Sequence, residues 1–211
     1  MMKKYKKRII ISSVITLLPI LAGLILWNRL PDTIATHFGN DNVANGWSSK
    51  PFVVFAMPLL LLGLHLFILF VTMNDPKRKN ISEKMFGFLI WFVPVLSVFI
   101  FSITYCNALG MYVNIGMAVN IIVGIVFLVI GNYLPKCKQN YTAGIRIPWT
   151  LNSTENWNRT HRLAGFLWVI AGLVMIVAAL LHLWSAWIFV MLLVSALIPT
   201  VYSYLLYRKG I

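Results

Sequence analysis

The residues best suited to chemistry lie in one polar stretch, from Gly144 to Gly165, of a chain that is otherwise mostly apolar. We call this stretch the motif segment. It holds a carboxylate, an imidazole and three guanidinium groups, which belong to Glu155, His161, Arg146, Arg159 and Arg162. A carboxylate and an imidazole supply acid–base chemistry, and guanidinium groups bind phosphates or carboxylates. Glu155 and His161 are spaced so that a helix directs them to different faces, which disfavours joint catalysis.

The rest of the sequence gives no reason to expect an enzyme. Hydrolysis needs a nucleophile with an activating base, or a set of metal ligands. The chain has no His-Glu-x-x-His, Gly-x-Ser-x-Gly or Cys-x-x-Cys motif, and no Asp or Glu within its apolar runs. We therefore expect no catalytic residues, no cofactor and no metal. A metal site built from His37, Asp32 and Asp41 is the alternative that these residue types leave open.

The composition predicts an all-α polytopic membrane protein. Of 211 residues, 60% are hydrophobic and 11% are charged, whereas about a quarter are charged in a soluble domain. Apolar runs close to the bilayer-spanning length recur along the chain. Six spans are predicted, at 9–27, 52–72, 86–107, 113–131, 163–182 and 186–206. Together they predict a single membrane domain over residues 1–211, with an outer loop at 28–51 and an inner loop at 132–162.

The basic residues predict the orientation of these spans. All Lys and Arg residues except Arg29 and Lys50 fall in the two termini or in the loops after spans two and four. The positive-inside rule therefore places both termini, and the motif segment, in the cytoplasm. This topology also explains the net charge of +13, so direct binding of nucleic acid is not expected. The first span is longer than the apolar part of a signal peptide, and we expect it to be retained.

The motif segment is predicted to begin a helix that continues into span five. Asn152 is a suitable N-cap, and Glu155 then occupies the third helical position of a capping box. On this helix Trp157 and His161 are four residues apart and share a face. Each Trp or Arg taken singly also suits a simple anchoring role at the membrane boundary.

The outer loop offers a second set of candidate contact residues, namely Pro31, His37, Trp47 and Lys50. Its turn-forming residues predict a loop. His37, two carboxylates and Trp47 together make this loop a candidate lid that meets an external ligand. Trp47 in the interfacial aromatic belt is the simpler interpretation of that residue. The pattern Pro-x-x-Ile-x-x-His-Phe, followed by Gly-Trp and Ser-Lys, resembles an uncharacterised domain that often begins SdpI-like proteins.

Two strings of the motif segment carry a second resemblance. Gly-Ile-Arg-x-Pro-Trp-Thr-Leu, followed by Glu-x-Trp-x-x-Thr-His-Arg-x-x-Gly, resembles the SdpI family of bacterial immunity proteins. The resemblance implies a six-span protein of the bacterial cytoplasmic membrane. The best-known member protects its cell from a secreted toxic peptide, senses that toxin and holds a transcriptional repressor at the membrane. The candidate residues of the segment are Gly144, Arg146, Pro148, Trp149, Thr150, Glu155, Trp157, His161 and Arg162.

Two functional hypotheses follow. The first is a non-enzymatic immunity and signalling protein whose partners are the lipid bilayer, an extracellular peptide toxin and a cytoplasmic repressor. Because the motif segment faces the cytoplasm in this topology, the outer loop would meet the toxin first. The alternative is a transporter or channel for a small or lipidic substrate, which mid-span His65 and several prolines within the spans favour. The lack of carboxylates within the spans opposes it. The sequence alone does not identify the toxin or the oligomeric state.

Overall fold

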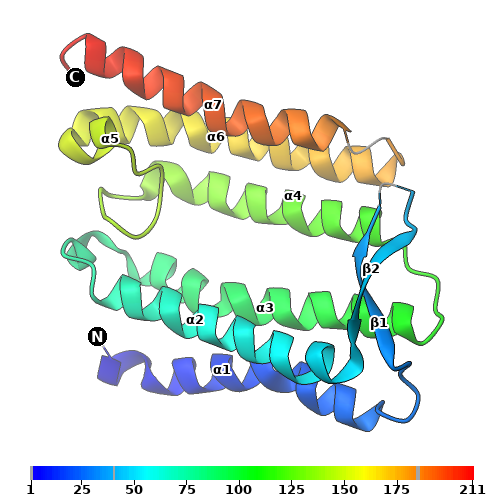
Figure 1. The fold of residues 1–211 in the computed structure, drawn as a ribbon. Coiled ribbons are helices and arrows are strands. Elements are labelled where there is room, and N and C mark those ends of the chain that lie inside the picture. Colours follow the sequence, from blue (N-terminus) through cyan, green and yellow to red (C-terminus); the bar gives the residue numbers. More distant parts are fainter. Residues whose placement is uncertain (1, 40, 184–185) are drawn as a thin grey trace. The chain divides into compact units, whose positions relative to one another are not determined.

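The structure is a computed structural model that describes residues 2–39, 41–183 and 186–211. It is mostly helical (Figure 1). Six of its helices are long and apolar enough to cross a membrane, at Lys4–Ile25, Phe52–Met73, Glu83–Ala108, Ile115–Lys136, Thr154–Leu180 and Phe189–Arg208. The predicted class, all-α with six spans, is therefore confirmed, while the predicted orientation stays a prediction.

The helices extend several of the predicted spans. The long helices are α1 (Met2–Ile25), α2 (Met57–Met73), α3 (Glu83–Ala108), α4 (Ile115–Tyr133), α6 (Thr154–Leu180) and α7 (Ala186–Arg208). Shorter elements are a π-helical turn before α2 (Phe52–Ala56), 3₁₀ turns at Arg78–Asn80 and Leu134–Lys136, and α5 (Pro148–Asn152). The largest difference concerns span five, because α6 starts at Thr154 rather than Leu163. A continuous helix here was expected from the capping pattern of the motif segment.

The chain divides into two compact units, and each is described by itself. Unit 1 consists of residues 1–74 and 83–115, and unit 2 of residues 75–82 and 116–211. The connection between α2 and α3, residues 75–82, is thus part of unit 2 although both helices belong to unit 1. The prediction of a single membrane domain stays a prediction.

In unit 1, the helices α1, α2 and α3 pack against one another through a buried polar row. The Ser97 hydroxyl donates to the Thr16 carbonyl at 2.9 Å, and the Thr16 hydroxyl donates to the Ser12 carbonyl at 2.9 Å. All three side chains are fully buried. Hydroxyl groups that donate to backbone carbonyls satisfy their polarity inside a membrane helix, and such bonds between helices hold the bundle together.

His65 of α2 joins this row. Its Nε2 lies 2.9 Å from Ser12 Oγ, and Ser12 Oγ donates its own proton to the Ile9 carbonyl at 2.9 Å. His65 must therefore donate through Nε2–H, so Nδ1 is the acceptor nitrogen. This Nδ1 is buried and has no hydrogen-bond partner among the described residues. A serine whose proton is already given to a carbonyl is not activated by the imidazole, so this pair is not a catalytic dyad.

The outer loop contains a β-hairpin, which the sequence analysis did not predict. Strands β1 (Thr33–Phe38) and β2 (Ala44–Ser49) pair antiparallel, with irregular register around His37. Both strands are short and mostly polar, so they lack the alternation that identifies a strand from sequence. One side chain anchors them, because Ile34 is buried in a cluster with Leu30, Val53, Val54, Phe101 and Tyr105. Asn40, also part of the predicted loop, lies outside the described residues.

In unit 2, glycines allow α4 and α6 to approach closely. A Cβ added to Gly172 would lie 2.6 Å from the Gly124 carbonyl oxygen, and one added to Gly165 would lie 2.7 Å from the Gly131 carbonyl oxygen. Only a residue without a side chain permits such backbone contact between membrane helices. Helices α6 and α7 also pack together extensively. Gly165, the last residue of the motif segment, is therefore a packing residue of this crossing.

Candidate functional site

The centre of the motif segment is the stacked pair Trp157 and His161. Their rings lie 3.9 Å apart at an interplanar angle of 19°, and both side chains are buried. The prediction that they share a face of the helix is confirmed. Trp157 Nε1–H donates to the Cys137 carbonyl at 2.6 Å. The indole thereby fastens the polypeptide that follows α4 to the first turns of α6.

The hydrogen bonds of His161 assign its protonation state. Nδ1 lies 2.8 Å from the Trp157 carbonyl, which only accepts, so Nδ1 carries the proton. Nε2 in turn accepts the backbone N–H of Ile145 at 2.9 Å. A protonated Nε2 could not accept this bond, so the observed network requires a neutral imidazole. Both nitrogens of His161 are occupied by the backbone, which gives the ring a structural role.

Gly144 completes this centre. Its φ of +114° lies in a region that other residues rarely adopt. A Cβ there would overlap His161 Nε2 and lie 3.0 Å from two ring carbons of Trp157. Both the backbone angle and the lack of space therefore require glycine at this position.

Thr150 closes the turn that leads into α5. Its hydroxyl donates to the Ile145 carbonyl at 2.7 Å and accepts the Ile147 N–H at 3.1 Å. The side chain is fully buried. Pro148 occupies the first position of α5, where its missing N–H costs no hydrogen bond. The Pro-Trp-Thr part of the motif is therefore a compact turn.

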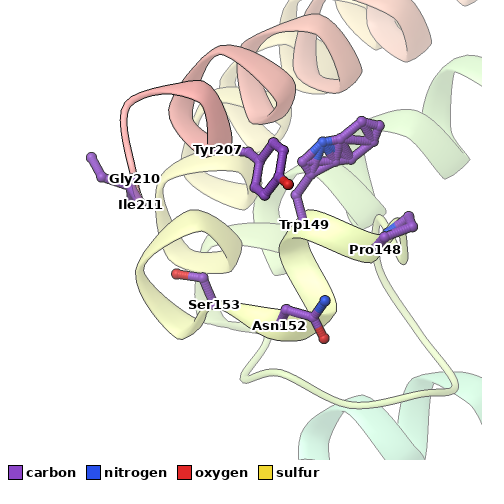
Figure 2. A pocket seen from close by; sticks show the side chains of 7 residues that line it. All are labelled: Pro148, Trp149, Asn152, Ser153, Tyr207, Gly210 and Ile211. Carbon is purple, nitrogen blue, oxygen red and sulfur yellow. The ribbon is translucent and has the colours of Figure 1, made fainter.

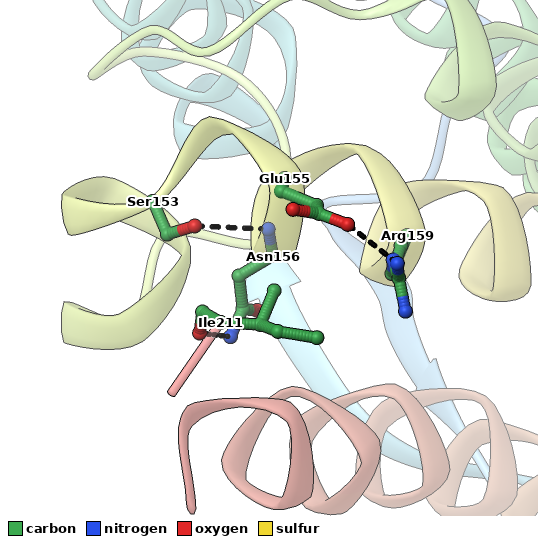
Figure 3. Close-up of polar contacts among 5 residues, drawn as sticks. All are labelled: Ser153, Glu155, Asn156, Arg159 and Ile211. Atoms are coloured by element: carbon green, nitrogen blue, oxygen red, sulfur yellow. Dashed lines mark hydrogen bonds and ion pairs between the residues drawn. The ribbon is translucent and has the colours of Figure 1, made fainter. Parts of the chain in front are cut away.

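The predicted N-cap of the long helix was wrong by one residue. Asn152 is the last residue of α5, and the cap of α6 is Ser153, whose Oγ accepts the Asn156 N–H at 3.2 Å (Figure 3). Ser153 has the extended backbone of a cap residue, because a tight turn already uses Asn152. Glu155 thus does not complete a capping box and instead forms an ion pair with Arg159 one turn later. Both side chains of this pair are largely exposed, so it adds little stability.

Asn156, which the sequence analysis did not select, joins α6 to the end of α7. Its Nδ2 donates to the carbonyls of Ser203 at 3.0 Å and Ile211 at 3.1 Å (Figure 3 draws the latter). Its Oδ1 accepts from the hydroxyls of Ser203 at 2.6 Å and Thr160 at 3.1 Å. The amide is fully buried with all these bonds formed. An isolated Asn gives no sequence signal for such a role.

A second group of residues missed from sequence fastens residues 75–82 to the loop after α4. Asp75 Oδ2 accepts the Tyr141 N–H at 2.8 Å and the Thr142 hydroxyl, while Oδ1 accepts the Lys77 N–H at 2.7 Å. Lys77 donates to the side chain of Gln139, and Asn80 Nδ2 donates to the Gln139 carbonyl at 2.7 Å. We call these contacts the Asp75 clasp. Its partners are far apart in sequence, which is why no local pattern revealed it.

Gln139 also links the Asp75 clasp to the motif segment. Its Nε2 donates to the carbonyls of Thr150 at 2.8 Å and Leu151 at 2.9 Å. Cys137 is buried nearby, and this burial raises the pKa of its thiol. The hydrogen bond from Asn140 Nδ2 offsets part of that rise. This part of unit 2 is thus one continuous network of buried hydrogen bonds.

Several candidate residues of the motif segment lie at or near its surface. Arg146 and Arg162 are exposed, and Arg146 Nη1 donates to the Tyr141 carbonyl at 2.6 Å. Trp149 packs edge-on against Tyr204 and Tyr207, with ring centroids at 5.5 and 6.1 Å. Pro148 and Trp149 line a pocket of about 460 Å³ (Figure 2). These residues, rather than Trp157 and His161, are available to partners.

The candidates of the outer loop lie on or beside the hairpin of unit 1. Lys50 Nζ donates to the Leu30 carbonyl at 2.9 Å, pairs with Asp32 at 3.1 Å and lies over the Trp27 ring. His37 Nδ1 bonds to the side chain of Asn45. Trp47 is 59% exposed on the hairpin, and Pro31 is also exposed. Lys50 therefore closes the base of the hairpin, while Trp47 offers contact area.

No metal centre is formed within the described part of the chain. There, no three His, Cys, Asp or Glu side chains gather in a way that could hold an ion. The alternative site of His37, Asp32 and Asp41 is not assembled, because His37 is bonded to Asn45 and Asp32 to Lys50.

Six apolar helices, a short β-hairpin and a hydrogen-bonded motif segment define a multi-pass α-helical membrane protein. Residues 136–203 match the model of the SdpI/YfhL protein family, and residues 14–62 match a domain of unknown function, DUF1648. The C-terminal part of the chain is therefore similar to the SdpI/YfhL family, and its N-terminal part is similar to DUF1648. It is 29% identical to Immunity protein SdpI of Bacillus subtilis strain 168 over 208 residues, 96% of this chain and 97% of that relative. No solved structure matches the chain.

Proposed function

We propose that this chain is a membrane immunity protein that protects a bacterium against a secreted, membrane-active peptide toxin. The observation that carries this proposal is the similarity to Immunity protein SdpI, which extends over almost the full length of both chains. The geometry supports a binding role rather than catalysis. His161 is occupied by backbone groups, and His65 faces a serine that has already donated its proton.

The hairpin of unit 1 is the proposed point of first contact with the toxin. With the N-terminus in the cytoplasm, the loop between α1 and α2 lies outside. Trp47 at 59% exposure and Val43 at 58% present apolar surface on this hairpin. Exposed apolar groups beside a bilayer suit a peptide that is itself partitioned into the membrane.

The motif segment is proposed as the inner end of a relay to a cytoplasmic regulator. The Asp75 clasp supports this role, because it fastens the chain between α2 and α3 to the loop that precedes the motif segment. A displacement of α2 or α3 would therefore pull directly on the hydrogen-bonded network of unit 2. Arg146 and Arg162 are exposed on this network and suit an acidic regulator surface.

A survival assay tests the immunity proposal. The chain is expressed in Bacillus subtilis that lacks SdpI, and survival is counted after co-culture with the parent strain. Restored survival supports the proposal. Survival equal to that with empty vector, while the SdpI gene itself restores growth at matched membrane levels, would contradict it.

One observation favours transport of a small molecule through unit 1 as the second candidate. The acceptor Nδ1 of His65 is buried mid-span without a partner among the described residues, as in a site that awaits a donor. His65→Gln keeps a donor near the Nε2 position toward Ser12 and removes the Nδ1 acceptor, whereas His65→Asn keeps a polar atom near Nδ1. Flux in proteoliposomes that survives His65→Asn but not His65→Gln would support transport. Equal flux in both variants would show that the Nδ1 acceptor of His65 has no part in transport.

A further inference from the structure

The pocket beside α5 has both polar and apolar walls. It is lined by Pro148, Trp149, Asn152, Ser153, Tyr207 and the backbone end at 210–211 (Figure 2). Its walls are held in place, because Trp149 packs on Tyr204 and Tyr207, and Asn156 holds the Ile211 carbonyl. The pocket is therefore a fixed feature of unit 2 rather than a gap between loose side chains.

Two cations stand next to lining residues of this pocket in the sequence, although neither lines it. Arg208 and Lys209 lie between the lining residues Tyr207 and Gly210, and both are exposed. Arg208 makes one long contact, at 3.4 Å, to the Tyr204 hydroxyl. The ion pairs among the described residues do not include Arg208 or Lys209. Both cations are therefore open to an anionic group at the end of α7.

The same corner continues into a surface suited to hydrocarbon. Val201, Tyr204 and Leu205 of α7 are 54%, 41% and 52% exposed, and they precede Arg208 at helical spacing on one side of the helix. Along this helix face, apolar side chains therefore lead to aromatic rings, a pocket and then cations. A phospholipid has the same order of chemistry, from acyl chains through the glycerol region to the phosphate.

We propose that the pocket between α5 and the end of α7 binds one anionic phospholipid. The phosphate lies at Arg208 and Lys209, the glycerol region lies against Trp149 and Tyr207, and an acyl chain follows Val201 and Leu205. A specific site of this kind differs from the general attraction of basic loops to a negative surface, because it needs these residues in particular. It is independent of the proposed immunity function.

Native mass spectrometry of the full-length protein in detergent tests the site, with phosphatidylglycerol as the probe and phosphatidylcholine as the neutral comparison. R208Q/K209Q is expected to lower the fraction carrying phosphatidylglycerol at least about fivefold, since two charge-assisted contacts are lost. R78Q/K79Q is the matched control, because both residues are exposed cations of unit 2 away from the pocket. It should change the bound fraction less than about twofold, as distant exposed charges are screened.

Tyr207→Ala is a second variant, which removes part of the pocket wall without changing charge. It should also lower the fraction of protein that carries phosphatidylglycerol. Equal losses in R208Q/K209Q and R78Q/K79Q would overturn the proposal in favour of diffuse attraction. Retention of phosphatidylcholine as strong as that of phosphatidylglycerol would reduce the site to an apolar groove. Full displacement of the lipid by excess inorganic phosphate would make it a simple anion site. Unchanged retention in both R208Q/K209Q and Tyr207→Ala would also overturn it.

Discussion

Gly144 lies directly against His161, with the backbone of Ile145 donating to the same Nε2 atom that a side chain at position 144 would overlap. The first and the second string of the motif therefore form one structure rather than two. The glycine leaves room for the imidazole, and the imidazole satisfies the N–H beside the glycine. Trp157 stacks on the same imidazole ring.

Replacing Gly144 with Ala should destabilise unit 2 strongly. The positive φ costs about 1–2 kcal/mol for a residue with a Cβ, and the overlap with His161 and Trp157 adds roughly 1–3 kcal/mol. Gly110→Ala is the matched control, because Gly110 also has a positive φ, of +81°, but no atom lies within 4 Å of its Cβ position. The midpoint temperature of thermal unfolding in detergent should fall clearly further for Gly144→Ala than for Gly110→Ala. An equal decrease in the unfolding temperature of both variants would mean that the overlap with His161 does not contribute to the destabilisation.

Asp75→Asn should weaken the attachment of residues 75–82 to the loop after α4. The carboxylate accepts two backbone N–H groups and a hydroxyl, and hydrogen bonds to a charged group contribute about 1.5–3 kcal/mol each. Amide hydrogen exchange at Tyr141, whose N–H donates to Asp75, should accelerate. Asp32→Asn is the control, since Asp32 is an exposed partner of Lys50 and should have little effect. Protection of the Tyr141 amide that is unchanged in Asp75→Asn would argue against the clasp.

Gly172→Ala should separate α4 from α6. The added methyl would meet the Gly124 carbonyl oxygen and Leu128 within 3.0 Å, and backbone atoms cannot yield easily. We expect a loss of about 1–3 kcal/mol from overpacking. Gly63→Ala in α2 has open space at its Cβ and should be neutral or stabilising. The pair can be compared by unfolding in increasing concentrations of denaturing detergent, and a Gly63→Ala effect as large as that of Gly172→Ala would contradict the account.

Cys137 should react slowly with maleimide in the folded protein. It is 6% exposed, and burial raises the pKa of its thiol, so the reactive thiolate is scarcer than in the unfolded chain at the same pH. The preference of the fold for the neutral thiol is fully present below the unfolded pKa and is lost as the pH rises through the folded pKa. In a Cys106→Ala background, labelling should increase with pH and be faster in Gly144→Ala. Labelling at neutral pH as fast as in the unfolded chain would show that the site is open.

The sequence was sufficient to predict the parts of the fold that follow from long apolar runs and from helix-capping residues. Six spans and the continuation of the motif segment into α6 follow from hydropathy and helix capping, and both are present. The stacking of Trp157 and His161 was also predictable, because residues four apart meet on any helix. The shift of the cap to Ser153 arose because α5 already ends at Asn152, a turn that depends on Thr150 contacting Ile145.

The remaining contacts depend on pairs that are distant in sequence. The Asp75 clasp joins Asp75 to Tyr141, 66 positions later, and Asn156 reaches Ser203 on α7 and Ile211 beyond its end. The hairpin was missed because its strands are short and mostly polar, and Ile34 packs against residues that lie far away in the sequence. The periodic pattern of apolar residues along one sequence does not reveal contacts between residues that are far apart in that sequence.

The most direct measurement of the central claim is survival of SdpI-deficient Bacillus subtilis that expresses this chain, counted after co-culture with the toxin-producing parent. The account predicts survival well above empty vector for the wild-type chain, a marked loss for Trp47→Ala on the outer hairpin, and no loss for Trp91→Ala, which alters an exposed tryptophan of α3 instead. No protection by the wild-type chain at a membrane level that matches SdpI would contradict the immunity function. Full protection by Trp47→Ala would contradict the role of the hairpin.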